Sequence, residues 1–188
     1  MNGVFSWLAV HFDLPILDWI SGHLGCGFLD AVMPVITALG NAGLIWIATA
    51  AILLCLPKHR RAGIAAGLAL SIGLIVCNLI LKELTARPRP YDFQLEHFGK
   101  YIPLLISAET DFSFPSGHTI ASFEAATVLM LYNKKIGIPA LTLACLIAFS
   151  RLYLYVHYPT DVLASVVLGI GIGFLGNYLS GKILKTKE

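Results

Sequence analysis

The sequence predicts an all-α membrane protein, a bundle of five to six transmembrane helices that follows an amphipathic N-terminal segment. The first observation is composition: of 188 residues, 57% are apolar and only 13% are charged, whereas a soluble domain carries about a quarter charged residues. The second is that the apolar residues form long runs, as membrane helices do. The formal net charge of +2, without a basic stripe, argues against nucleic acid as a partner.

Five apolar runs are interpreted as membrane spans. Several are shorter than the ~20 residues that cross a bilayer, but flanking small or polar residues extend each of them. They are Leu44–Leu56, Ala62–Leu81, Thr119–Leu131, Ile136–Phe149 and Val162–Leu179. Phe28–Leu39 is either a sixth, short span or an extension of the next helix. Before it, Val4–Leu24 mixes apolar residues with Asp13, Asp18 and His11, which is typical of a helix lying in the membrane interface.

Basic residues in three segments predict the orientation, because cytoplasmic connections are enriched in lysine and arginine. Counting the spans places all three on one face, which is then cytoplasmic: residues 58–61, Lys134 with Lys135, and Lys182, Lys185 and Lys187. We therefore expect an interfacial segment over 1–26, a membrane domain over 27–182 and a cytoplasmic tail over 183–188. The extracytoplasmic face of the plasma membrane then receives segment 83–116 and the turn around His157.

The first polar cluster on that face is KELTARPRP, residues 82–90. Lys82 ends a long span, and the two prolines stop the helix and stiffen an extended exit. Taken alone, the cluster is typical of a snorkelling lysine and of arginines that hold lipid headgroups.

The second cluster is FPSGHT, residues 114–119, at the start of a hydrophobic helix. Pro115 and Gly117 turn the chain, and Ser116 can cap the helix that follows. A helix start offers free amides and a positive dipole end, which together favour an anion. His118 adds an ionisable nitrogen. The alternative is an ordinary capped helix with an interfacial histidine, and this stretch alone does not decide between the two.

The third cluster is SRLYLYVHYPTD, residues 150–161. Arg151 ends one span, Asp161 begins the next and His157 lies between them. A spacing of four lets the carboxylate hold the imidazole if the turn is helical, which fixes the tautomer and leaves the other nitrogen free. An aromatic belt at the interface explains the tyrosines, but it does not explain why Arg151 and Asp161 bracket the histidine.

The three clusters together suit phosphoryl transfer. Cations and backbone amides bind phosphate, one histidine held by an aspartate suits a nucleophile, and a second histidine suits a proton donor. A metal site is not indicated, because the lysine and arginines repel cations and only one carboxylate is a plausible ligand. The four scattered cysteines also lack metal-site spacing. The sequence thus predicts metal-free phosphoryl transfer at the outer membrane–water interface.

These residues resemble a known signature, that of the type 2 phosphatidic acid phosphatase superfamily, which also includes bacterial acid phosphatases and vanadium haloperoxidases. The three parts are Lys82-x6-Arg89-Pro90, then Pro115-Ser116-Gly117-His118, then Ser150-Arg151-x5-His157-x3-Asp161. The resemblance covers about residues 29–179. It implies the helical core of that superfamily and a lipid phosphatase without a cofactor, whose site faces the extracytoplasmic side.

The resemblance also implies a role for each matching residue. His157 attacks phosphorus and becomes phosphohistidine, Asp161 orients it, and His118 protonates the leaving oxygen. The non-bridging phosphate oxygens are held by Lys82, Arg89, Arg151, Ser116 and Gly117. Two residues are left open. Arg87 is either a headgroup contact or merely exposed, and Glu124 is either functional or a hydrogen-bonding partner of a neighbouring helix.

The substrate expected first is undecaprenyl diphosphate, which cell-wall polymerisation releases on the outer face. Phosphatidylglycerophosphate and phosphatidic acid are the alternatives, and many members that act on undecaprenyl diphosphate carry aspartate where Gly117 stands, which counts against the first choice. Other classes are a transporter, which would spread polar residues through the membrane depth, and a binding protein, which would show a broken motif. A homo-oligomer is left open, because four glycines could pack helices within or between chains: Gly67, Gly73, Gly169 and Gly173.

Overall fold

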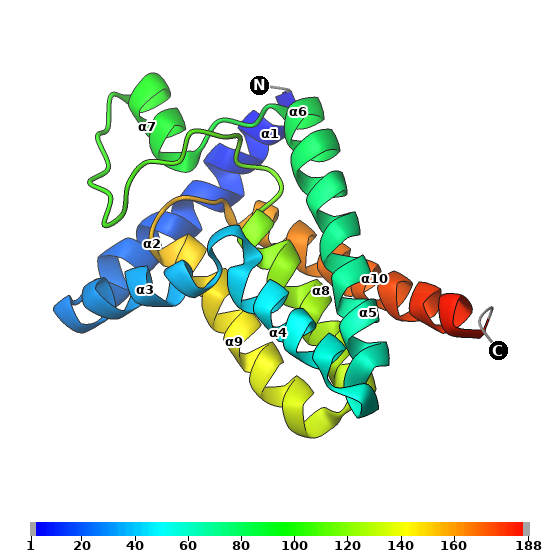
Figure 1. Cartoon of the computed structure of the whole chain (residues 1–188). Coiled ribbons are helices and arrows are strands. Elements are labelled where there is room, and N and C mark those ends of the chain that lie inside the picture. Colours follow the sequence, from blue (N-terminus) through cyan, green and yellow to red (C-terminus); the bar gives the residue numbers. More distant parts are fainter. Residues whose placement is uncertain (1–2, 186–188) are drawn as a thin grey trace.

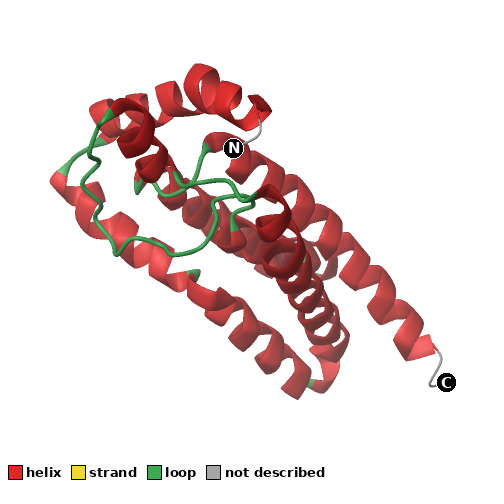
Figure 2. Ribbon diagram, turned by 90° about the horizontal axis from the view of Figure 1, so that it is seen from above, coloured by secondary structure: helices red, strands yellow, loops and turns green. Residues whose placement is uncertain are grey.

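The computed structural model describes residues 3–185, and this part of the chain is helical without any strand (Figures 1 and 2). The prediction of an all-α fold is confirmed. Of the expected tail, 183–188, residues 186–188, and with them Lys187, lie outside the described residues. The helices are α1 (Gly3–Leu8), α2 (Leu14–Leu24), α3 (Gly27–Leu39), α4 (Leu44–Cys55), α5 (Arg60–Leu74), α6 (Lys82–Thr85), α7 (Pro90–Phe98), α8 (Gly117–Tyr132), α9 (Lys134–Tyr153) and α10 (Pro159–Lys185).

Two π-helical stretches join neighbouring helices into longer ones. Ala9–Asp13 connects α1 to α2, and Ile75–Leu81 connects α5 to α6. Three stretches are long and apolar enough to cross a membrane: Pro57–Phe98, Lys134–Tyr153 and Pro159–Leu184. A fourth is added if α3 and α4, which are bent by 42° at a short break, form one span. Phe28–Leu39 is thus a helix of its own at an angle to the next, and the count of five to six spans stays a prediction.

α8 lies at the centre of the bundle and packs against α5, α9 and α10 (Figure 1). Small residues bring these helices close together. A Cβ added at Gly173 of α10 would lie 2.7 Å from the Thr127 Cβ and 2.8 Å from the Glu124 carbonyl oxygen of α8, far inside contact distance. Gly73 and Gly169 also pack within the chain, whereas Gly67 has open space beside it.

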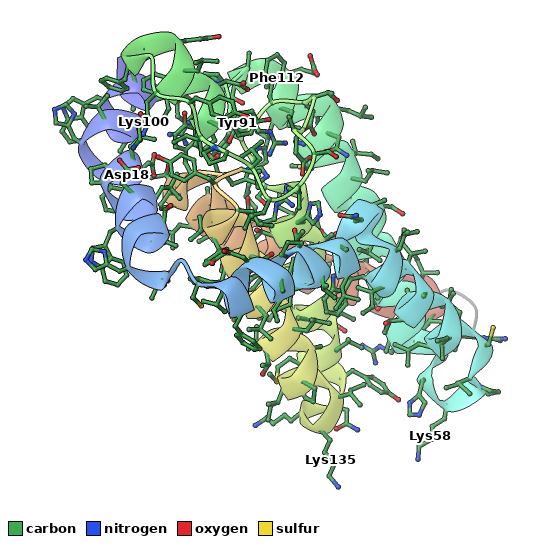
Figure 3. The ribbon with its side chains drawn as sticks, turned by 90° about the vertical axis from the view of Figure 1, so that its left-hand side faces the viewer. Asp18, Lys58, Tyr91, Lys100, Phe112 and Lys135 are labelled. Carbon is green, nitrogen blue, oxygen red and sulfur yellow. The ribbon has the colours of Figure 1, made fainter. Side chains whose placement is uncertain are left out.

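The two ends of the bundle differ in charge and structure. Lys58 and Lys135 extend from one end, while Tyr91, Phe112 and Lys100 lie at the other (Figure 3). At the basic end the two connections are tied together, because the Tyr132 hydroxyl donates to the Lys58 carbonyl at 2.9 Å. Two of the three basic segments therefore share one end, opposite segment 83–116.

The N-terminal helices pack at the end opposite the basic connections. Leu14, Leu17 and Ile20 share one apolar cluster with Phe93 of α7 and with residues 153–158 between α9 and α10. Asp13, which the sequence placed in an interfacial segment, is fully buried there. The interfacial position of 1–26 stays a prediction, but this segment is a packed part of the end that holds the three motifs.

Candidate active site

The three motifs meet around one cavity of about 320 Å³. Five of the eight expected site residues line it: Lys82, Arg89, Gly117, His118 and His157. The other three, Arg151, Ser116 and Asp161, lie behind the wall and are buried. Apolar residues of α4, α5 and α8 also line the cavity: Ile47, Leu70, Leu74, Ile120 and Ala121.

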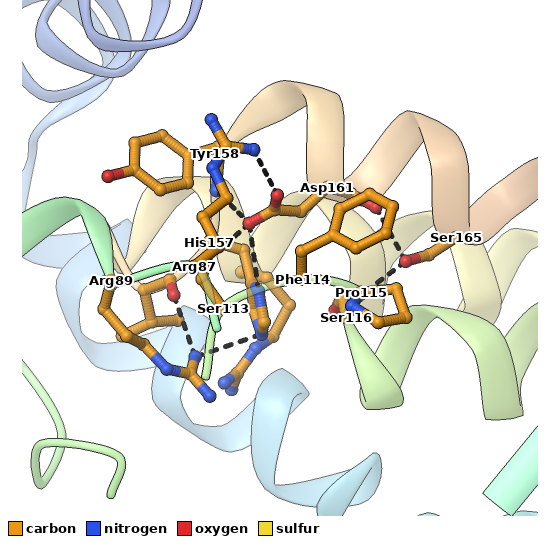
Figure 4. A network of polar contacts seen from close by, with 12 residues as sticks. Arg87, Arg89, Ser113, Phe114, Pro115, Ser116, His157, Tyr158, Asp161 and Ser165 are labelled. Carbon is orange, nitrogen blue, oxygen red and sulfur yellow. Dashed lines mark hydrogen bonds and ion pairs between the residues drawn. The ribbon is translucent and has the colours of Figure 1, made fainter. Parts of the chain in front are cut away.

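His157 lies in the turn between α9 and α10, with 1% of its surface exposed. Its Nε2 is 3.1 Å from the Arg89 Nη1. A guanidinium can only donate, so Nε2 is the acceptor and the neutral ring carries its proton on Nδ1. Nδ1 is 3.6 Å from the Asp161 Oδ2, which places the proton on the side of the carboxylate. Figure 4 shows this arrangement.

The charge state of His157 follows from its surroundings. Burial lowers the pKa of His157 well below its usual value, and the cations Arg89, Arg151 and Lys82 lower it further. The imidazole is therefore neutral at physiological pH, and its Nε2 lone pair faces Arg89 and the cavity. This is the protonation state that a nucleophile requires.

Asp161 belongs to the first turn of α10 and is fully buried. Its Oδ2 accepts hydrogen bonds from the Ser113 hydroxyl at 2.5 Å and from the Tyr158 amide at 3.1 Å. Its Oδ1 accepts from Arg87. A carboxylate held by this many donors cannot rotate freely, so the oxygen that faces His157 stays in place.

The start of α8 supplies the helix terminus that the sequence predicted. The Ser116 hydroxyl accepts from the Thr119 amide at 3.5 Å and from the Thr119 hydroxyl at 3.0 Å. It therefore serves as the helix cap and does not line the cavity. Gly117, the first residue of α8, does line the cavity, where the dipole of the helix favours an anion.

His118, the second residue of α8, lines the same cavity as Arg89 and His157. Its Nε2 is 3.0 Å from the Asn41 Oδ1, at the bend between α3 and α4. Gly40 makes room for the ring, since a Cβ there would lie 2.7 Å from the His118 Cδ2. Sequence reasoning missed Asn41 and Gly40, and their only signal was a polar residue between glycines at the start of an apolar run.

Two carboxylates from segment 99–116 occupy the cationic side of the cavity. Glu109 pairs with Arg151 and lies 3.5 Å from Arg89, and Asp111 pairs with both Lys82 and Arg89. We refer to Glu109 and Asp111 as the loop carboxylates. Sequence reasoning missed both, although two acidic residues just before FPSGHT, on a face rich in cations, were the available signal.

The loop carboxylates are ionised. Burial raises the pKa of Glu109, but the charge and hydrogen bond of Arg151, together with Arg89, outweigh it and hold the pKa below its usual value. For Asp111 the same balance holds, with Lys82 and Arg89 as the cations that lower the pKa. The side chains are still 26% and 49% exposed, so they can be displaced by a stronger anion.

Arg87 and Glu124 differ from expectation. Arg87 is fully buried and pairs with Asp161 and Asp13, so the prediction of a headgroup contact or an exposed side chain is wrong. Glu124 lines the cavity, and its carboxyl fills the space beside Gly73. Its buried Oε2 has no hydrogen-bond partner among residues 3–185, so that oxygen does not tie α8 to a neighbouring helix.

The chain is similar in sequence and in structure to known membrane phosphatases. The PAP2 superfamily profile matches residues 62–184. An undecaprenyl-diphosphatase of Sulfolobus acidocaldarius is 34% identical over 163 residues, which cover 85% of this chain and 76% of that protein. The structure of LpxE from Aquifex aeolicus has a TM-score of 0.74 at 27% identity, covering 87% of this chain and 93% of the other. That of a transmembrane PAP2-type phosphatidylglycerolphosphate phosphatase from Bacillus subtilis has a TM-score of 0.68 at 28% identity, covering 96% and 94%.

Proposed function

The chain belongs to the PAP2 superfamily and is a membrane lipid phosphatase, and from this premise we propose that it hydrolyses undecaprenyl diphosphate through a phosphohistidine formed on His157. One observation carries the proposal. The His157 Nε2 lies 3.1 Å from the Arg89 Nη1 on the wall of a cavity that Lys82, His118 and the start of α8 also line. A nucleophile, phosphate-binding cations and a second histidine thus surround one space. Burial and Arg151 lower the pKa of His118 to about 3, so His118 acts as the proton donor once the charge of a bound phosphate raises that pKa.

The reaction has two steps in this geometry. In the first, the His157 Nε2 attacks phosphorus, the bond from phosphorus to the bridging oxygen breaks, and His118 protonates that oxygen as it leaves. Asp161 stabilises the charge that develops on the His157 ring. Lys82 and Arg89, which line the cavity, hold the non-bridging oxygens, where negative charge grows in the transition state. Arg151 lies behind the wall and reaches them when the phosphate displaces Glu109. In the second step water attacks the phosphohistidine and releases phosphate.

The shape of the cavity supports a lipid substrate. Its cationic side suits a phosphate or diphosphate, and its apolar lining from α4, α5 and α8 includes the exposed Ile47 and Leu74, where an apolar chain can lie. A relative that is 34% identical is named undecaprenyl-diphosphatase, which favours a polyprenyl diphosphate. The basic connections at the opposite end support an extracytoplasmic site in the plasma membrane (Figure 3).

A second candidate substrate is phosphatidylglycerophosphate. The similarity to the Bacillus subtilis phosphatase structure favours it, as does glycine at position 117, where an aspartate would have suggested the polyprenyl substrate. Both substrates present a phosphate at the interface with apolar chains in the bilayer, so the same cavity accommodates either.

Purified protein in detergent, with EDTA present, distinguishes these substrates. We expect phosphate release from undecaprenyl diphosphate to be faster than from phosphatidylglycerophosphate or phosphatidic acid, and EDTA to leave the rate unchanged because cations of the chain itself bind the phosphate. Faster release from phosphatidylglycerophosphate would reassign the substrate. Loss of activity in EDTA that Mg²⁺ restores would contradict metal-independent hydrolysis.

The loop carboxylates give a prediction about phosphate binding. Because Glu109 and Asp111 occupy the cations that hold phosphate, a bound phosphate has to displace them. The double variant Glu109→Gln, Asp111→Asn is therefore expected to lower the inhibition constant of inorganic phosphate by about tenfold, equivalent to ~1.4 kcal/mol.

Glu96→Gln is the matched control, since Glu96 is an exposed carboxylate of α7 that does not line the cavity. This change should leave phosphate inhibition as in the wild type. Weaker inhibition in the double variant would mean that the loop carboxylates help to build the phosphate site and do not compete for it.

A further inference from the structure

Arg87 belongs to the first motif, but it does not line the cavity. Its side chain is fully buried, and both of its terminal nitrogens donate to side chains of the protein. Nη1 donates to the Asp161 Oδ1 and, at 2.8 Å, to the Thr160 hydroxyl, while Nη2 donates to the Asp13 Oδ2 at 2.7 Å. The guanidinium also lies 3.7 Å from the centre of the Tyr158 ring, a favourable cation–π distance.

Asp13 brings the N-terminal segment into this network. It ends the π-helical stretch Ala9–Asp13 and has no exposed surface. Its Oδ1 accepts from the Thr160 amide at 2.9 Å, and its Oδ2 accepts from the Thr160 hydroxyl at 2.8 Å. Asp13 therefore binds both Arg87 and the first turn of α10, one residue before Asp161.

The consequence for Asp161 is geometric. One of its oxygens is held by Arg87, and the other is held by Ser113 and the Tyr158 amide and faces the His157 Nδ1 at 3.6 Å. Figure 4 shows Arg87 on one side of this carboxylate and His157 on the other. A buried carboxylate needs a paired cation to remain charged, and Arg87 is the cation in direct contact with it.

We propose that Arg87 and Asp13 are positioning residues for the nucleophile. Asp13 fixes Arg87, Arg87 fixes Asp161, and Asp161 orients His157, so that the N-terminal segment is part of the catalytic apparatus. This inference rests on the proposed role of His157. It adds two residues that have no role in the three-part signature. One of them, Asp13, lies more than 140 positions before Asp161 in the chain.

The alternative is that the buried pair only anchors the N-terminal segment. The two roles differ in kinetics. An anchor changes the stability and the amount of folded enzyme, whereas a positioning residue changes the rate of phosphoryl transfer in folded enzyme. Because neither residue lines the cavity, a positioning role predicts a lower kcat with little change in KM.

The test uses Asp13→Asn and Arg87→Lys in the full-length enzyme. We expect each to slow single-turnover phosphoenzyme formation by about 10- to 100-fold, as a small displacement of a reacting group does, with KM within about threefold of the wild type. His11→Gln is the matched control, because His11 lies in the same π-helical stretch as Asp13 but is exposed, and its Nδ1 is 3.0 Å from the Trp7 carbonyl of the same segment. Its rate should stay within about twofold of the wild type.

Two results would overturn the inference: an unchanged rate in Asp13→Asn, or a raised KM at unchanged kcat. Thermal unfolding in detergent checks that each variant is folded, and Asp13→Asn decides the question if Arg87→Lys does not fold. If the wild type lacks turnover that depends on His157, the proposed function fails and this inference with it. If the wild type turns over and the variants match it, only this inference fails.

Discussion

Replacing His157 with alanine is expected to lower kcat by roughly 10⁴-fold or more, the effect seen when an enzyme loses its nucleophile. The Nε2 of His157 lies 3.1 Å from the Arg89 Nη1 at the cavity, and alanine leaves no atom there to attack phosphorus. The measurement is kcat for phosphate release from undecaprenyl diphosphate, normalised to folded protein.

His23→Ala is the control for this prediction, since His23 is an exposed histidine of α2 whose ring bonds to the Trp19 carbonyl of the same helix. It should retain wild-type kcat. If His157→Ala keeps activity within about tenfold of the wild type, water attacks the substrate directly and the covalent route is wrong.

Arg89→Ala is expected to lower kcat/KM by about 10³-fold, the upper range for removing one donor to a developing negative charge. Arg89 contacts the nucleophile, and its Nη1 also donates to the Val156 carbonyl at 2.8 Å. Alanine removes a phosphate-binding cation and leaves that carbonyl without this donor. The kcat/KM of Arg89→Lys should lie between those of the wild type and Arg89→Ala, because lysine keeps the charge but loses the planar fork of donors.

The control for Arg89 is Arg60→Ala, an exposed arginine that begins α5 at the opposite end of the bundle. We expect its kcat/KM to match the wild type. An unchanged kcat/KM in Arg89→Ala would mean that Arg89 does not bind the phosphate and that Lys82 and Arg151 are the cations that do.

Much of the site could be predicted from the sequence because its residues come in short, rigid motifs. The spacing between His157 and Asp161 spans one turn at the start of α10, so local geometry brings the two side chains to 3.6 Å. Pro115 and Ser116 form another short motif, and they mark the start of α8. The apolar runs likewise predicted helices, since burying a backbone in lipid requires internal hydrogen bonds.

What could not be predicted depends on contacts between distant segments. Asp13 meets Arg87 across 74 positions, and Asn41 meets His118 across 77. Neither residue carries a local signal of its partner. Arg87 and Arg89 are chemically alike and two positions apart, yet one reaches the carboxylate behind the nucleophile and the other the cavity. An extended chain turns residues two positions apart to the same side, so their spacing does not separate their roles. Distant partners do: Arg87 pairs with Asp13 and Asp161, whereas Arg89 contacts Val156 and His157.

The most direct test of the central claim is to trap the covalent intermediate. Wild-type enzyme is mixed with substrate labelled on its terminal phosphate, quenched in alkali, in which phosphohistidine survives, and mapped by mass spectrometry. Formation of phosphohistidine at His157, with none in His157→Ala, is the expected result. Rapid phosphate release without any labelled protein at times shorter than one turnover would contradict a phosphohistidine mechanism.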